Sequence, residues 1–95
     1  MFARMARFEG LGHEQIDEML RGIKQRSEGG PPEGVPSTEA LFLTDRDSGE
    51  LVALSLYESE EDMRTGDATL RQMTPPVSGL ARPDVRMYEV GLRMP

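Results

Sequence analysis

Two short apolar runs separated by a polar stretch form the clearest pattern in the chain. They span residues 40–44 and 51–57, and Gly49 lies in the polar stretch between them. Glycine favours the tight backbone turn that joins two antiparallel strands. The pattern therefore predicts a β-hairpin, for which we expect a four-residue loop at residues 47–50.

Both faces of this hairpin carry apolar side chains. The expected cross-strand pairs are Leu43 with Leu54, Leu41 with Leu56, Phe42 with Ser55 and Ala40 with Tyr57. The first two pairs make one face of leucine, and the other two make a mixed face. Helices can cover only one of these faces, so the other needs a second layer.

The remaining segments alternate between strand and helix patterns. Residues 2–8 and 85–94 have strand character, whereas residues 13–26 carry an apolar stripe at helical spacing. A second helix is expected to begin after Ser59, which can cap it, and to end before residues 74–76. The order is strand, helix, strand, strand, helix, strand.

This order is typical of an α+β, ferredoxin-like βαββαβ fold with a four-stranded antiparallel sheet. A length of 95 residues fits a single domain over residues 1–95. Because both hairpin faces are apolar, we expect a homodimer whose sheets meet face to face.

Composition narrows the choice of partners. The net charge of −6 disfavours nucleic acid and anionic membrane surfaces, because an acidic surface repels phosphate. The chain has no cysteine, and arginines interrupt the apolar residues of its first segment. We therefore expect no signal peptide, no membrane span and a cytoplasmic location.

Four segments carry a resemblance to a known family. They are the strand end at residues 42–46, the turn at 47–49, the sequence Leu-Tyr-Glu-Ser-Glu-Glu at 56–61, and the last strand at 87–90. Together they resemble the antibiotic biosynthesis monooxygenase-like domains of the dimeric α+β barrel superfamily. The resemblance implies a dimer whose sheets close into a barrel, with a cavity between helices and sheet in each subunit. Members include cofactor-free oxygenases that form quinones and haem-degrading enzymes.

The residues on which those enzymes rely are missing. The oxygenases use an asparagine and a tryptophan, neither of which occurs in this chain, and no histidine follows the second helix, where the haem enzymes have one. We therefore expect no cofactor, no haem binding of that kind and no assigned catalytic residue. The expected function is binding of a small apolar or aromatic molecule between helices and sheet. The alternative is a cofactor-independent monooxygenase acting on a phenolic or polyketide-like substrate.

The candidate ligand site is centred on Gly66, whose missing side chain is expected to leave space between the second helix and the sheet. Arg7 is the first choice to orient a ligand, on the assumption that it faces the helices together with Met5; Tyr57 is the second. The candidate ligand-binding residues are Met5, Arg7, Tyr57, Met63, Gly66, Leu70, Met73 and Tyr88.

Other chemistry-bearing residues have simpler explanations. His13, the only histidine, could be a general base, but its position fits a helix start in solvent. The acidic residues at 58–62 could hold a hard cation, but helix capping and the helix dipole also account for them. The methionines suit either a core or an adaptable pocket wall. We expect no metal site.

Overall fold

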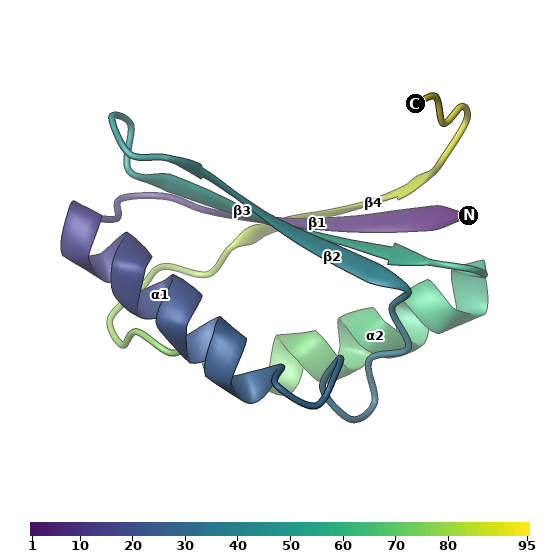
Figure 1. Cartoon of the computed structure of the whole chain (residues 1–95), viewed down its shortest axis with the longest axis horizontal. Helices are drawn as coiled ribbons and strands as arrows, with labels where there is room; N and C mark the ends of the chain where they lie inside the picture. Colours follow the sequence, from purple (N-terminus) through teal and green to yellow (C-terminus); the bar gives the residue numbers. More distant parts are fainter.

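The computed structural model describes residues 1–95, and its two helices cover one face of a four-stranded sheet (Figure 1). The strands are all antiparallel and lie in the order β2-β3-β1-β4. The elements are β1 (Phe2–Phe8), α1 (His13–Arg26), β2 (Glu39–Asp45), β3 (Glu50–Tyr57), α2 (Glu60–Gln72) and β4 (Asp84–Glu89). The predicted α+β class and element order are confirmed, and the topology is compatible with a ferredoxin-like fold.

Both helices begin and end where their sequences favour it. In α1 the Gln15 side chain accepts a hydrogen bond from the backbone N–H of Gly12, and basic residues occupy the last turn. In α2 the Ser59 hydroxyl accepts from the backbone N–H of Asp62 at 3.1 Å, as predicted. Neither helix has the length and apolar character required to cross a bilayer.

The hairpin register differs from the prediction by two residues. Leu41 lies opposite Leu54, Asp45 opposite Glu50, and the loop covers residues 46–49 rather than 47–50. The Asp45 carboxylate accepts from the backbone N–H groups at 47 and 48, which closes the turn, while Glu50 pairs with Arg7 at 3.2 Å. These partners offset the repulsion between the carboxylates of Asp45 and Glu50, which lie directly opposite each other.

The turn also packs against the start of α1. Gly49 has φ of +73° and its carbonyl accepts from the backbone N–H of Leu11 at 2.9 Å. A side chain at Gly49 would meet the Leu11 backbone, so only glycine fits there. Arg46 in the same turn donates to Asp17 of α1 at 2.7 Å, which adds a second link.

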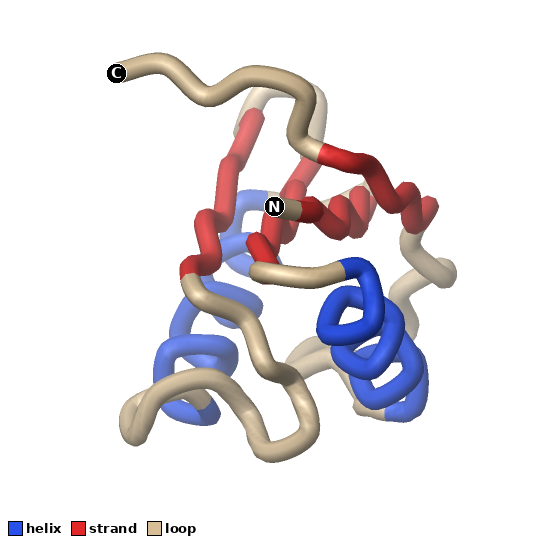
Figure 2. Tube along the Cα trace, turned by 90° about the vertical axis from the view of Figure 1, so that its right-hand side faces the viewer, coloured by secondary structure: helices blue, strands red, loops and turns tan.

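The last strand is shorter than predicted. It ends at Glu89, and residues 90–95 leave the sheet on the side away from the helices and cross over the open face (Figure 2). Arg93 in this tail lies 3.5 Å from Glu39 of the opposite edge strand. The strand prediction for 90–94 is therefore wrong, because this segment follows the sheet surface and not its edge.

Two separate apolar clusters join the helices to the sheet. The first contains Leu11, Ile16, Met19, Leu51 and Val77, and it attaches α1. The second contains Val35, Tyr57 and Met63, and it attaches α2. Each cluster lies at one end of the sheet, so the middle of the covered face is left without a large core side chain.

The space expected beside Gly66 is filled by Tyr57. The Tyr57 side chain is fully buried, and a Cβ built at Gly66 would lie 2.6 Å from its hydroxyl oxygen. Glycine at 66 therefore serves close contact between α2 and the sheet and does not open a cavity there. The expectation of a void at this position is wrong.

Changing Gly66 to alanine should accordingly destabilise the fold. We expect the free energy of unfolding to fall by roughly 1–3 kcal/mol, because the added methyl group overpacks against Tyr57. Gly29→Ala is the control, since no atom lies within 4 Å of a Cβ at that exposed position. Urea denaturation of both variants checks this, and equal stabilities would contradict it.

Candidate functional site

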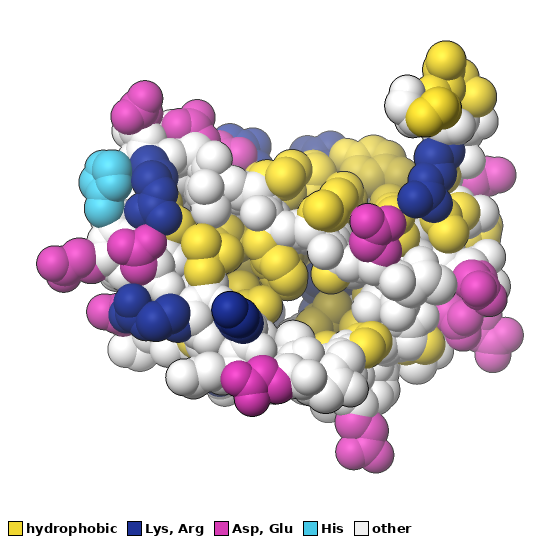
Figure 3. Space-filling view, viewed as in Figure 1, with side chains coloured by type: hydrophobic (Ala, Val, Ile, Leu, Met, Phe, Trp, Pro, Cys, Tyr) yellow, Lys and Arg dark blue, Asp and Glu magenta, His cyan; other side chains and the backbone are white.

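A cavity of about 520 Å³ lies between the helices and the sheet. In Figure 3 the surface is hollowed between α1 and α2, and hydrophobic side chains gather around the hollow. Fourteen of the 27 lining residues are hydrophobic, four are arginines and none is acidic. Its size falls in the range of about 300–1,000 Å³ typical of small-molecule sites.

The floor of this cavity follows from the side chains on the covered face of the central strands. Phe2 and Tyr57 pair at one end of β1 and β3, and Phe8 pairs with Leu51 at the other. Between them Ala6 lies opposite Ala53, and Arg4 lies opposite Ser55. The large residues at the two ends of the strands pack against the helices. The small pair in the middle, Ala6 and Ala53, leaves space between the sheet and the helices.

The walls come from segments that are distant in sequence. Met19 and Ile23 of α1 form one wall, and Leu70 of α2 forms the facing one. The loops at residues 27–38 and 73–83 supply the remaining sides, including Val35 and Leu80.

Arg4 is the buried charged residue of the floor. It is 5% exposed, and its Nε donates to the Asp67 carboxylate at 2.9 Å. Neither terminal nitrogen of Arg4 donates to a protein acceptor. Asp67 also accepts from Arg71 at 2.9 Å, so one carboxylate serves two arginines that both line the cavity.

These contacts set the ionisation of Asp67. Partial burial raises its pKa, but the hydrogen bonds from Arg4 and Arg71, together with their charges, outweigh that effect. The pKa of Asp67 therefore lies below its ordinary value, and the carboxylate stays ionised at neutral pH.

Beside Arg4, two hydroxyl groups bond to each other. Ser55 Oγ donates to the Tyr57 phenol oxygen at 3.0 Å, and both side chains are buried. Ser55 lines the cavity, whereas Tyr57 lies behind it against Gly66. Tyr57 thus faces the helices as predicted, but it fills the core beside the cavity.

The candidate residues divide between the two faces of the sheet. Leu70 and Met73 line the cavity, and Met63 lies in the neighbouring core cluster. Met5, Arg7 and Tyr88 lie on the opposite, open face, shown by their pairing with Leu54, Val52 and Ala3.

The assignment of Arg7 to the helix side is therefore wrong. The first strand carries apolar and basic residues on both faces, so its alternation alone left the orientation open. Arg7 instead contacts Glu9 and Glu50 on the open face. Arg4 takes the place assigned to Arg7. Arg4 could have been identified from the sequence because it lies on the same face of the strand as the two aromatic residues Phe2 and Phe8.

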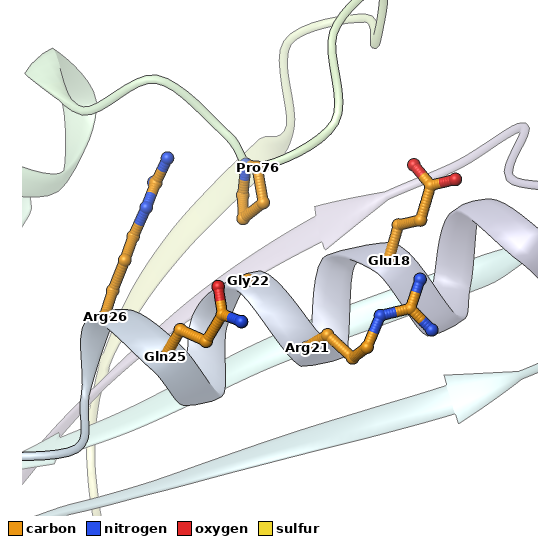
Figure 4. A pocket seen from close by; sticks show the side chains of 6 residues that line it. All are labelled: Glu18, Arg21, Gly22, Gln25, Arg26 and Pro76. Carbon is orange, nitrogen blue, oxygen red and sulfur yellow. The ribbon is translucent and has the colours of Figure 1, made fainter.

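A second, shallow hollow lies on the outer side of α1 (Figure 4). Pro76, from the segment after α2, points at Gly22, where a Cβ would lie 2.3 Å from the proline ring. No hydrophobic side chain lines this hollow. It marks the close contact that holds the segment after α2 against α1.

The other candidates for chemistry lie outside the cavity. His13 is exposed at the start of α1 and does not line it. No three His, Asp or Glu side chains are grouped so that they could hold a metal ion.

Comparison with protein families and with curated proteins identified no relative of this chain. No protein-family model matches the chain, and no curated protein matches its sequence.

Replacing Asp67 should reveal how much the arginine cluster contributes. Asp67→Asn should lower the free energy of unfolding at pH 7 by roughly 3–5 kcal/mol, because Arg4 is left buried without a counter-charge. Since the folded pKa of Asp67 is below the ordinary value of 3.8, its contribution is complete above about pH 3.8 and is lost as pH falls through the folded pKa.

The stability difference between parent and variant should thus shrink in strong acid. Urea denaturation at pH 7 and below pH 3 measures it. Glu33→Gln, which changes an exposed loop carboxylate that forms no ion pair, is the control and should change neither value appreciably. A difference independent of pH would count against this role of Asp67.

Proposed function

We propose that the protein is a cytoplasmic homodimer that binds a small apolar or aromatic molecule in the cavity between helices and sheet. The observation that carries the proposal is the cavity itself, whose walls are largely hydrophobic and whose floor holds a few polar groups. The fold is compatible with the antibiotic biosynthesis monooxygenase-like resemblance, which supports a site in the same place. The absence of cysteine supports the cytoplasmic location.

Binding is favoured over catalysis by the chemistry of the lining. None of the lining residues is a histidine, carboxylate, lysine, cysteine or tyrosine. These are the side chains that usually transfer protons during catalysis. A monooxygenase acting on a phenol would need a group to remove the phenolic proton, and the cavity wall offers none.

The open face of the sheet supports the dimer. Leu41, Leu43 and Tyr88 are 45%, 53% and 47% exposed there. Leu41 and Leu43 lie opposite Leu54 and Val52, and Tyr88 lies opposite Ala3, which in turn pairs with Leu56. A contiguous apolar face on a small domain marks a contact surface. An identical face on a second copy would cover it through two-fold symmetry. In the proposed dimer the two sheets form the barrel, and each subunit keeps its own cavity.

A charge in this face should break the dimer. Leu41→Asp should convert the dimer to a monomer, because two desolvated carboxylates would meet an apolar surface. Thr44→Asp is the control, since Thr44 is exposed on the same strand but on the other face. Sedimentation at micromolar concentration tests both variants. A parent protein that sediments only as a 10.6 kDa species would refute the dimer.

Filling the floor of the cavity should abolish ligand binding. The probe is N-phenyl-1-naphthylamine, a neutral aromatic compound that fluoresces in apolar surroundings. Ala53→Phe should weaken its binding at least tenfold, because the ring would occupy the space above the small pair of the floor. Ala68→Phe, on the exposed side of α2, should bind as the parent does. Equal binding by the parent and Ala53→Phe would place the probe elsewhere.

A further inference from the structure

We propose that the cavity selects an anionic amphipathic molecule, with a carboxylate bound by Arg4 and an apolar body in the space above Ala6 and Ala53. This inference rests on the proposed ligand-binding function and specifies the chemical class of the ligand.

The hydrogen bonding of Arg4 favours a carboxylate ligand. A guanidinium carries five N–H donors in a planar fork that matches a carboxylate. Arg4 uses Nε for Asp67, and its two terminal nitrogens have no protein acceptor although the residue is only 5% exposed. Arg7 Nε is the one enclosed side-chain nitrogen without a hydrogen-bond partner, so the terminal nitrogens of Arg4 are open to the cavity, where a ligand carboxylate can accept from them.

The charge of the cluster formed by Arg4, Asp67 and Arg71 also favours an anion. Arg4 and Arg71 share the single carboxylate of Asp67, which leaves one positive charge uncompensated. Both arginines line the cavity and Asp67 does not. One ligand carboxylate would balance the charges of the cluster and accept from the free nitrogens of Arg4.

The charge around the whole lining is positive as well. Arg26 and Arg82 also line the cavity, and neither forms an ion pair with a carboxylate. The chain as a whole has 17 acidic and 11 basic residues, yet four arginines and no acid line this space. The lining thus has the opposite charge to the protein and favours an anion.

The rest of the lining suits the body of such a ligand. Phe42, Leu70 and Leu80 face the space above the floor from three different elements. Ser55, directly opposite Arg4 in the sheet, adds a hydroxyl-bearing side chain to the lining. A carboxylate at Arg4 would therefore have polar neighbours, and the chain attached to it would have apolar ones.

The test compares two ligands that differ only in the head group. Decanoate and decan-1-ol are each titrated to displace N-phenyl-1-naphthylamine from the full-length parent protein. We expect decanoate to bind at least tenfold more tightly than the alcohol, because only the carboxylate satisfies the arginine cluster.

Variants locate the head group. Arg4→Gln combined with Asp67→Asn removes both charges of the buried pair and shortens the side chain at position 4, and it should reduce the preference for decanoate at least threefold. Arg71→Gln, at an exposed position that tolerates change, should reduce the preference for decanoate about three- to tenfold even if the double variant does not fold. Arg21→Gln, an exposed arginine of α1 outside the cavity, is the control and should leave the preference unchanged.

The outcomes separate this inference from the function on which it rests. Equal affinities for decanoate and decan-1-ol in the parent, with both displacing the probe, would overturn the anionic head group and leave ligand binding intact. A preference for decanoate that survives in Arg71→Gln and in a folded double variant would overturn the role of the Arg4 cluster. No binding of the probe or either ligand would overturn both proposals.

Discussion

The structure depends on the contrast between large and small side chains on the covered face of the sheet. Aromatic and leucine side chains at the two ends of β1 and β3 provide the surfaces on which the helices pack. The alanine pair in the middle is too small to reach either helix. One pattern of side-chain size therefore attaches two helices and keeps them apart, and the cavity is its direct result.

Much of the fold could be predicted because its signals are local. Periodicity defined α1, the Ser59 cap defined the start of α2, and the apolar alternation of the hairpin located β2 and β3. The two-residue shift in register kept every side chain on its predicted face, because side chains alternate with a period of two. The length of the last strand was overestimated, since residues 90–94 continue the alternation without a neighbouring strand to pair with.

The site was harder to predict because it depends on orientation. Leu70 and Met73 were identified from the helix pattern, but Arg7 and Met5 were placed on the wrong face. The strand has arginines on both faces, and only the position of Arg4 on the same face as Phe2 and Phe8 favours it over Arg7. Its partner Asp67 is 63 positions away, so sequence periodicity cannot connect the two. Likewise, nothing local indicated that Tyr57 would occupy the room beside Gly66.

The shared carboxylate of Asp67 also bears on how fast a charged molecule could arrive. The protein carries a net charge of −6, so at distances beyond the roughly 8 Å Debye length of physiological salt an anion meets a weak repulsion. The local positive charge of the cluster acts only once the anion has reached the mouth of the cavity. The same protein thus attracts an anion at short range through its arginine cluster and repels it at long range through its net negative charge. The positive field of the arginine cluster would slow the release of a bound anion, but it would not attract an anion from a distance. Ionic strength would therefore affect the association rate and the residence time in different ways.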